Sequence, residues 1–259
     1  LRSDPYLGIY YYRFNTTVEP LDDVRVRQAL ALAINREEIV NDVVRGGQQP
    51  AETFVPPGFE SYTPPTGIPY DPDRARALLA EAGFPNGEGF PELELFFNTS
   101  EGHRKIAEAI VRMWNETLGL NLVLDNAEWK TFLDRTRNDL LDYEISRAGW
   151  IGDYMDPLTF LELMRSGNGN NRTGWGDARF DALIAEAMTS PDRSRHYEAL
   201  SEAEAILLEA APVAPIYFYV NHSLLHPRVQ GWNAKLLDNR PMKAISFAPE
   251  PVPFNPRGN

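Results

Sequence analysis

Hydrophobic and polar residues alternate most clearly near the middle of the chain. Residues 92–98 ("ELELFFN") have the two-residue period of a strand with one buried face, formed by Leu93, Leu95 and Phe97. The residues that follow, up to Gly119, have the spacing of an amphipathic helix, with an apolar face of Ile106, Ile110, Met113 and Trp114. A second strand is predicted at 120–126. A strand, helix and strand at this spacing are typical of a right-handed crossover between two parallel strands.

Capping residues mark the helices in the first third of the chain. Asp23 precedes a stretch with apolar residues at helical spacing, and it is a suitable N-cap. Asn35, with Glu38 three residues later, resembles a second cap and predicts a break into a second helix. Residues 71–83 ("DPDRARALLAEAG") have aspartate at the cap, proline at the first helical position and glycine beyond the end, which predicts a helix.

The remaining elements follow from shorter patterns. Further strands are predicted at 7–15, 143–149 and 213–220, and further helices at 128–139, 156–164, 177–189 and 191–210. Asp156 is the expected cap of the helix at 156–164, and Ser190 with Pro191 is expected to start the helix at 191–210. The proline-rich stretch 50–72 predicts an extended loop. Strands alternating with helices in this way indicate an α/β fold.

Composition and charge narrow the function. The chain has 25 basic and 37 acidic residues, a net charge of −12, which argues against nucleic acid as a partner and disfavours an anionic membrane surface. It has no cysteine, which excludes disulfides and thiolate chemistry. No apolar run approaches the ~18 residues of a spanning helix, and the first residues lack a signal-peptide pattern. The protein is therefore either cytoplasmic or has lost a signal, and the chain is compatible with being part of a longer one.

Most common catalytic and cofactor motifs are missing from the sequence. The four histidines lack ligand spacing, so we expect no metal, and no G-x-S-x-G, phosphate-binding loop or G-x-G-x-x-G occurs, so we expect no cofactor. Asp153 and Asp156 could act as the paired carboxylates of a glycoside hydrolase. Acid pairs at this spacing are more often structural, so an enzyme is the weaker hypothesis.

Two further sets of residues carry charge in an unusual setting. Arg147 and Asp153 lie six residues apart in "SRAGWIGDYMDP", which makes them an ion pair, a catalytic pair or the two poles of a binding site. His103 lies in the first turn of its predicted helix if Ser100 is the cap, where free backbone N–H groups favour a carboxylate or phosphate. An ordinary exposed histidine is an equally good interpretation from the sequence.

Taken together, several blocks resemble one family. The segments are "DDVRVRQALALAINREEIV", "FFNTSEGHRKIAEAIVRMW", "AEWKTFL", "SRAGWIGDYMDPLTFL" and "PVAPIYFYVN". In this order and spacing they resemble the C-terminal half of the oligopeptide-binding proteins of ABC importers, over roughly residues 8 to 246. The resemblance implies a lobe of type II periplasmic-binding-protein fold, a mixed sheet flanked by helices. It also implies a receptor rather than an enzyme, with short peptides as ligands and an ABC transporter permease as partner.

The resemblance assigns roles to individual residues. Asp153 matches the aspartate that holds the α-amino group of the ligand. The terminal carboxylate would be engaged by His103, Arg147 and either Arg135 or Arg137, an alternative that the alignment leaves open. The walls of side-chain pockets and the border of the site near the hinge would be formed by Trp129, Trp150 and Tyr219. Other ligands of the same family, a sugar or a metal chelate, remain an alternative that Asp153 discriminates.

The resemblance also predicts how the chain is divided. Residues 1–220 are expected to form the second ligand-binding lobe, and residues 221–259 to return to a first lobe that this chain lacks. Without that lobe, the tail is expected to pack irregularly, to extend away or to pair with another chain, and to end in a disordered segment. The implied location is periplasmic or extracytoplasmic, with a lipid anchor at a missing N-terminus as one form of attachment.

Overall fold

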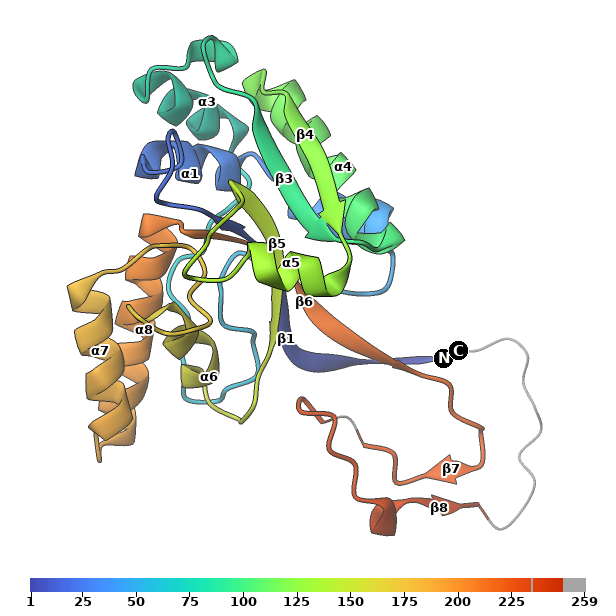
Figure 1. Ribbon diagram of the computed structural model, residues 1–259. Coiled ribbons are helices and arrows are strands. Elements are labelled where there is room, and N and C mark those ends of the chain that lie inside the picture. Colours follow the sequence, from blue (N-terminus) through green and yellow to red (C-terminus); the bar gives the residue numbers. More distant parts are fainter. Residues whose placement is uncertain (234, 249–259) are drawn as a thin grey trace.

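A mixed six-stranded sheet organises the computed structural model, which describes residues 1–233 and 235–248 (Figure 1). The strand order is β2-β6-β1-β5-β3-β4. The strands are β1 (Arg2–Phe14), β2 (Gln49–Pro50), β3 (Leu93–Asn98), β4 (Leu122–Ala127), β5 (Ile145–Ile151) and β6 (Val213–Ser223).

The pairing of these strands explains why the sheet is mixed. β1 lies between β5 and β6 and is antiparallel to both, whereas β3 is parallel to β4 and to β5. The parallel β3–β4 pair, joined by the helix α4 (Glu101–Leu118), confirms the predicted crossover. β3 pairs with β5 only at Ile145 and Ser146. Within the described residues, the rest of β5 therefore has a strand neighbour on one edge only, the edge facing β1.

The predicted caps of the first helices are confirmed. The carboxylate of Asp23 accepts a hydrogen bond from the N–H of Arg25 at the start of α1 (Val24–Leu32). Asn35 accepts one from the N–H of Glu38 in α2 (Arg36–Glu38), which continues as the π-helical segment η1 (Ile39–Val44). Asp71 caps α3 (Pro72–Glu81), and the short helix η2 (Pro85–Gly87) follows it.

The long helix α4 packs its predicted apolar face against the sheet. Ile106, Ile110, Met113 and Trp114 are all buried, and the indole N–H of Trp114 donates to the carbonyl of Leu30 at 2.8 Å. The helix ends at Gly119, which has a φ of 73°. A Cβ at this position would lie 2.3 Å from the carbonyl oxygen of Asn86, so the turn needs glycine for both conformation and space.

Four α-helices lie between β4 and β6 in the chain, and β5 separates the first of them from the other three. They are α5 (Trp129–Arg135), α6 (Leu158–Leu161), which runs into the 3-10 turn η3 (Glu162–Met164), α7 (Ala178–Thr189) and α8 (Arg193–Ala210). The expectation that Ser190 and Pro191 start the last helix is wrong. Asp192 is the N-cap instead, because its carboxylate accepts the N–H of Ser194 at 2.9 Å.

A buried carboxylate fixes the long proline-rich loop to α8. Glu204 is fully buried and accepts the N–H groups of Phe54 and Val55, both at 2.7 Å. It also accepts the hydroxyl of Tyr62. Burial raises the pKa of Glu204 to about 7, while the hydrogen bonds it accepts act in the opposite direction. One side chain thus anchors two parts of a loop that has little regular structure of its own.

The C-terminal segment leaves the body of the molecule (Figure 1). β6 continues to Ser223, pairing with the first residues of β1, so the strand passes the expected boundary at 220. The strands β7 (Val229–Gln230) and β8 (Ser246–Phe247), with the turn η4 (Met242–Ala244) between them, pair with each other as a small separate sheet. The tail also contacts the body, since the N–H of Leu7 donates to the carbonyl of Leu236 at 2.8 Å. This contradicts the expectation of a tail that packs irregularly, extends away or pairs with another chain, and the expected disorder falls mainly on 249–259, outside the described residues.

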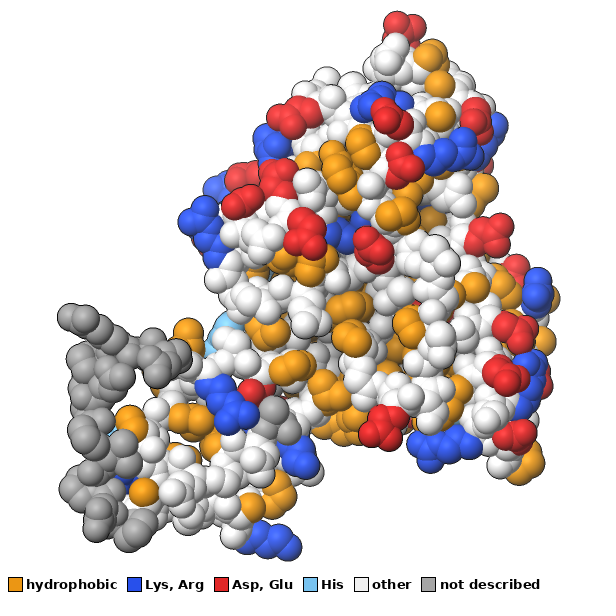
Figure 2. Space-filling view, turned by 180° about the vertical axis from the view of Figure 1, so that it is seen from behind, with side chains coloured by type: hydrophobic (Ala, Val, Ile, Leu, Met, Phe, Trp, Pro, Cys, Tyr) orange, Lys and Arg blue, Asp and Glu red, His pale blue; other side chains and the backbone are white. Residues whose placement is uncertain are grey.

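The surface carries acidic and basic side chains that are mixed with one another. In the view of Figure 2, acidic and basic side chains alternate over the body of the molecule, with the tail standing to one side. Among residues 1–233 and 235–248, no helix is long and apolar enough to cross a membrane.

Candidate functional site

Arg147 is a cation held among aromatic side chains. It lies on β5 opposite Tyr12 of β1, and its guanidinium carbon is 4.8 Å from the centroid of the Tyr10 ring. Its Nη2 donates to the hydroxyl of Tyr219 at 3.2 Å, and its Nη1 donates to Oδ1 of Asn98 at 3.3 Å. In the described part of the chain it makes no ion pair with a carboxylate, and its Nε is buried without a hydrogen-bond partner. Within the described chain, Arg147 therefore has a positive charge without a carboxylate partner and an N–H donor without an acceptor, both of which suit an anionic ligand.

The aromatic surroundings come from alternation along two neighbouring strands. Tyr10 of β1 and Tyr217 of β6 are paired in register, and their rings stack with centroids 4.8 Å apart. Tyr219, two residues further along β6, packs edge-on against Tyr217 at 5.5 Å. Residues two apart on a strand share a face, which places these rings beside Arg147. Burial raises the pKa of Tyr10 to about 12, so its hydroxyl remains protonated at neutral pH.

His103 joins this cluster from the first turn of α4. Its Nδ1 lies 3.2 Å from the hydroxyl of Tyr10. Burial, and then the positive charge of Arg147, lower the pKa of His103 to about 4, so the ring is neutral at pH 7. Ser100 occupies the N-cap position as expected, but its side chain makes no capping hydrogen bond. The structure thus brings together three of the predicted residues, His103, Arg147 and Tyr219.

Asp153 lies just beyond the end of β5 and is exposed. Its N–H donates to Oγ1 of Thr159 at 3.0 Å, which fixes the backbone, while its carboxylate makes no ion pair within the described residues. The sequence interpretation expected a buried aspartate in a closed cleft; in this single lobe the side chain faces solvent. Asp156, by contrast, is engaged: its carboxylate accepts the N–H of Leu158 at 3.0 Å and lies 2.9 Å from Nε2 of His196.

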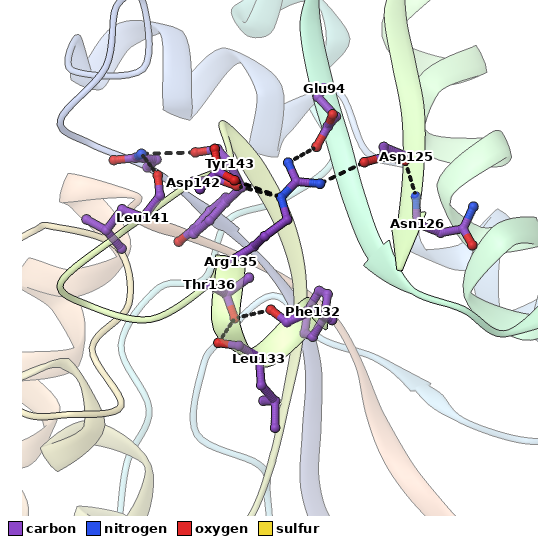
Figure 3. A network of polar contacts seen from close by, with 11 residues as sticks. Glu94, Asp125, Asn126, Phe132, Leu133, Arg135, Thr136, Leu141, Asp142 and Tyr143 are labelled. Carbon is purple, nitrogen blue, oxygen red and sulfur yellow. Dashed lines mark hydrogen bonds and ion pairs between the residues drawn. The ribbon is translucent and has the colours of Figure 1, made fainter. Parts of the chain in front are cut away.

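Arg135 and Arg137 have different surroundings. The guanidinium of Arg135 makes ion pairs with Glu94 at 2.9 Å, Asp125 at 2.7 Å and Asp142 at 3.0 Å (Figure 3). It also lies over the ring of Phe96, 4.0 Å from the centroid.

The three guanidinium nitrogens of Arg135 therefore all make bonds, and these join β3, β4 and the loop before β5. Arg137 is exposed and, among the residues that the structure describes, forms an ion pair only with Asp139, two residues along the chain, at 3.2 Å. Of the two alternatives, Arg137 is the one free to reorient toward a ligand.

Trp129 and Trp150 line one cavity of about 170 Å³ between the sheet and α5. Trp129 is exposed at the start of α5 and stacks on Phe132 with centroids 5.8 Å apart. Trp150 is half-buried, and its indole N–H has no partner in the described chain. The other lining residues are Tyr11, Arg13, Phe132, Leu133, Arg147, Ala148, Gly149, Leu163, Asn170 and Arg172.

The open edge of β5 connects these features. Between Arg147 and Ile151 the strand pairs with β1 on one side and has no neighbouring strand of this chain on the other, within the described residues. A strand with one open edge presents unpaired backbone N–H and C=O groups that an extended chain can bond. Among the residues that the structure covers, no group of three or more His, Asp or Glu side chains is arranged to hold a metal ion.

The sequence interpretation missed several of these residues. Tyr10 and Tyr217 belong to the site although both were treated only as parts of strands. The signal available in the sequence is their spacing, since "YYY" and "YFY" place tyrosines two apart on adjacent strands. Arg13 and Arg172 were also missed, because their approach to one cavity depends on the register of β1 and on the loop after η3.

Comparison with known proteins identifies the family of this chain. A family model described as bacterial extracellular solute-binding proteins, family 5 Middle, matches residues 1–172. The oligopeptide-binding protein OppA of Bacillus subtilis is 40% identical over 229 residues, which is 85% of this chain and 42% of that protein. Heme-binding protein A of Haemophilus influenzae is 34% identical over 232 residues, which is 87% of this chain and 42% of that protein.

A solved structure has the same fold. The periplasmic murein tripeptide-binding protein MppA, in its unliganded open form, matches with a TM-score of 0.86 and 36% identity, over 95% of this chain and 48% of that one. The expected type II lobe with a mixed sheet is thereby confirmed. The chain spans about half the length of the relatives it matches, or less. It belongs to the bacterial extracellular solute-binding proteins of family 5.

Proposed function

We propose that this chain is the second lobe of an extracytoplasmic receptor that captures short peptides and delivers them to an ABC transporter permease. The observation that carries the proposal is the pairing of two unengaged charges with an open strand edge. Arg147 makes no ion pair with a carboxylate in the described chain, the carboxylate of Asp153 is likewise unpaired there, and the open part of β5 lies between them. A zwitterionic peptide in extended form has complementary charges and backbone groups.

The proposed carboxylate end of the site contains a neutral donor as well as a cation. Because the phenol of Tyr10 stays protonated, it can donate to Nδ1 of His103. The remaining ring proton of His103 then lies on Nε2, from which it can donate to a ligand carboxylate. Arg147 supplies the charge, and Tyr219 and Asn98 hold its guanidinium in place. We propose that Arg137 contributes a second cation when the ligand is bound, since Arg135 is engaged elsewhere.

Closure by the other lobe would make occupancy and conformation interdependent. Removing one partner of a buried charge pair typically costs ~3–5 kcal/mol, so an Asp153 carboxylate enclosed without an ammonium group is unfavourable. A ligand that supplies the ammonium group therefore favours the closed form, in proportion to its differential affinity for the two forms. In this proposal residues 1–220 form the lobe, and the remainder of the chain leads to the other lobe.

Two other functions are weaker. A receptor of the same family for a non-peptide solute is the nearer one, since one relative of this chain is named a heme-binding protein. A ligand without an ammonium group would leave Asp153 unpaired. A glycoside hydrolase would need Asp156 as a free carboxylate, and that group is held by the Leu158 N–H and His196.

The test is calorimetric titration of the complete two-lobed protein with trialanine and N-acetyl-trialanine. If Asp153 binds the ammonium group, acetylation and Asp153→Asn should each weaken binding by ~100-fold or more, because a buried charge partner is lost. Asp73→Asn, an exposed aspartate on α3, is the matched control and should have no effect. Equal affinity for the free and acetylated peptides would contradict the proposal.

A further inference from the structure

The cavity lined by Trp129 and Trp150 contains two arginines that the proposed capture of peptide ends does not use. Arg13 projects from β1 and Arg172 from the loop after η3, and both line the cavity. Arg13 is only 6% exposed. Within residues 1–233 and 235–248, neither arginine makes an ion pair with an acidic side chain.

Their existing contacts leave donors unused. Arg13 donates from Nε to Oγ of Ser146 at 3.2 Å and from Nη2 to the carbonyl of Arg147 at 3.4 Å. Arg172 donates from Nη1 to Oγ1 of Thr136 at 3.2 Å. These are bonds to neutral acceptors, so both positive charges remain uncompensated. Desolvation, and then the charge of Arg13, lower the pKa of Arg172, which shows that the two guanidinium groups are close enough to repel each other.

Two like charges beside one partly enclosed space are unfavourable unless an anion joins them. The walls of the space add apolar surface, from Tyr11, Trp129 and Trp150. Its volume of about 170 Å³ corresponds to roughly five water molecules, comparable to the five non-hydrogen atoms of a glutamate side chain. The cavity therefore combines a charged inner part with an aromatic wall.

Strand register connects this cavity to the bound chain. Arg13, Tyr11 and Ile9 of β1 pair with Ser146, Ala148 and Trp150 of β5, so these residues share one face of the sheet. Arg147 and Gly149 alternate with them. An extended ligand added along the open edge of β5 would also alternate its side chains between the two faces. One of them would then lie over the face that carries Trp150 and Arg13.

From this arrangement we infer that Arg13 and Arg172 form a subsite for an acidic side chain of the ligand, so that the receptor prefers peptides with aspartate or glutamate at one position. The inference rests on the proposed peptide-receptor function and goes beyond it. Recognition of the two ends cannot distinguish one peptide sequence from another, because all peptides have the same terminal groups, whereas this subsite would select for a side chain. A pair of arginines is suited to a carboxylate through charge-assisted hydrogen bonds. Trp129 and Trp150 would enclose the methylene groups.

The experiment measures calorimetric affinities of the complete two-lobed protein for tripeptides that differ in one atom type. Glutamate is placed at each position of trialanine in turn and compared with glutamine at the same position. At one position we expect the glutamate peptide to bind about 10-fold tighter, the scale of a desolvated charge pair. Arg172→Gln should abolish that preference and leave the affinity for trialanine unchanged.

Arg13→Gln provides a second variant, and Arg76→Gln on α3 is a control that removes an exposed arginine outside the cavity. Because Arg13 is buried, the trialanine affinity of its variant reports whether the fold is intact. The inference is overturned if glutamate and glutamine peptides bind equally at all positions, or if Arg172→Gln weakens every peptide alike, which would assign the pair to the terminal carboxylate. Both outcomes leave the proposed function standing. Failure to bind any peptide would overturn both.

Discussion

The hydroxyl of Tyr10 lies 3.2 Å from Nδ1 of His103, which links the central strand of the sheet to the first turn of α4. Burial, and then the positive charge of the neighbouring Arg147, keep the His103 imidazole neutral, with a pKa lowered to about 4. The histidine is therefore a donor that can still gain a proton when an anion arrives.

Peptide binding should take up protons below neutral pH. A ligand carboxylate next to His103 raises its pKa above the free value of about 4, so the bound form holds more protons than the free form between these two pKa values. Affinity should consequently rise as the pH falls from 7 toward 5. Titration in two buffers of different ionisation enthalpy measures the uptake. His103→Gln should remove it, and an unchanged uptake in this variant would contradict the role of His103.

The hydroxyl of Tyr219 should stabilise the site through Arg147. Tyr219→Phe removes the acceptor for Nη2 of Arg147, a hydrogen bond of 3.2 Å to a charged group. We expect a loss of ~1 kcal/mol in the free energy of unfolding, together with weaker peptide binding. Urea denaturation and calorimetry measure the two quantities. Tyr70→Phe, an exposed tyrosine outside the site, is the control. Wild-type affinity in Tyr219→Phe would show that Arg147 needs no support.

Experiment should show which of Arg135 and Arg137, the two alternatives that the sequence could not decide between, binds the ligand. Arg135→Gln breaks three ion pairs and should lower the free energy of unfolding by ~1–2 kcal/mol, because its partners are partly solvated, without changing peptide affinity. Arg137→Gln should do the opposite, reducing affinity with little change in stability. The reverse pattern would assign the ligand to Arg135.

Stability should depend on pH through Glu204. Its folded pKa of about 7 lies above the unfolded value near 4.5, so the folded state binds more protons between these values. The contribution is complete below pH 4.5 and is lost as the pH rises through 7, by up to ~3 kcal/mol. Urea denaturation from pH 5 to pH 8 measures the slope, and Glu204→Gln should flatten it.

A second variant tests the hydrogen bonds of the same side chain. Glu204→Ala leaves the buried N–H groups of Phe54 and Val55 without an acceptor and should cost ~3 kcal/mol or more at any pH in this range. An unchanged pH slope in Glu204→Gln would show that Glu204 is ionised throughout.

Local patterns predicted most of the framework. The alternation of Leu93, Leu95 and Phe97 and the apolar face of α4 identified the crossover because both depend only on period and burial. Caps at Asp23, Asn35 and Asp71 were predicted correctly because the capping bond is made within three residues. The prediction that Ser190 starts the last helix was wrong because capping is so local. Asp192 stands two residues nearer to the helix and accepts the free N–H group instead.

The site was less predictable, because its contacts join distant parts of the chain. The engagement of Arg135 depends on Glu94 and Asp125 from two other strands, which no local pattern reveals. The approach of Tyr10 to His103 requires both the sheet and the position of α4. The exposure of Asp153 depends on the geometry beyond the end of β5. Only the family resemblance identified Arg147, His103 and Tyr219 together.

Native mass spectrometry of the complete two-lobed protein, purified without denaturation, would weigh whatever ligand the protein carries. We expect a series of adducts with the masses of short peptides, absent when Asp153 is replaced by alanine. A single non-peptide adduct that persists in the Asp153→Ala variant would contradict the assignment of Asp153 and Arg147 as the two poles of a peptide site.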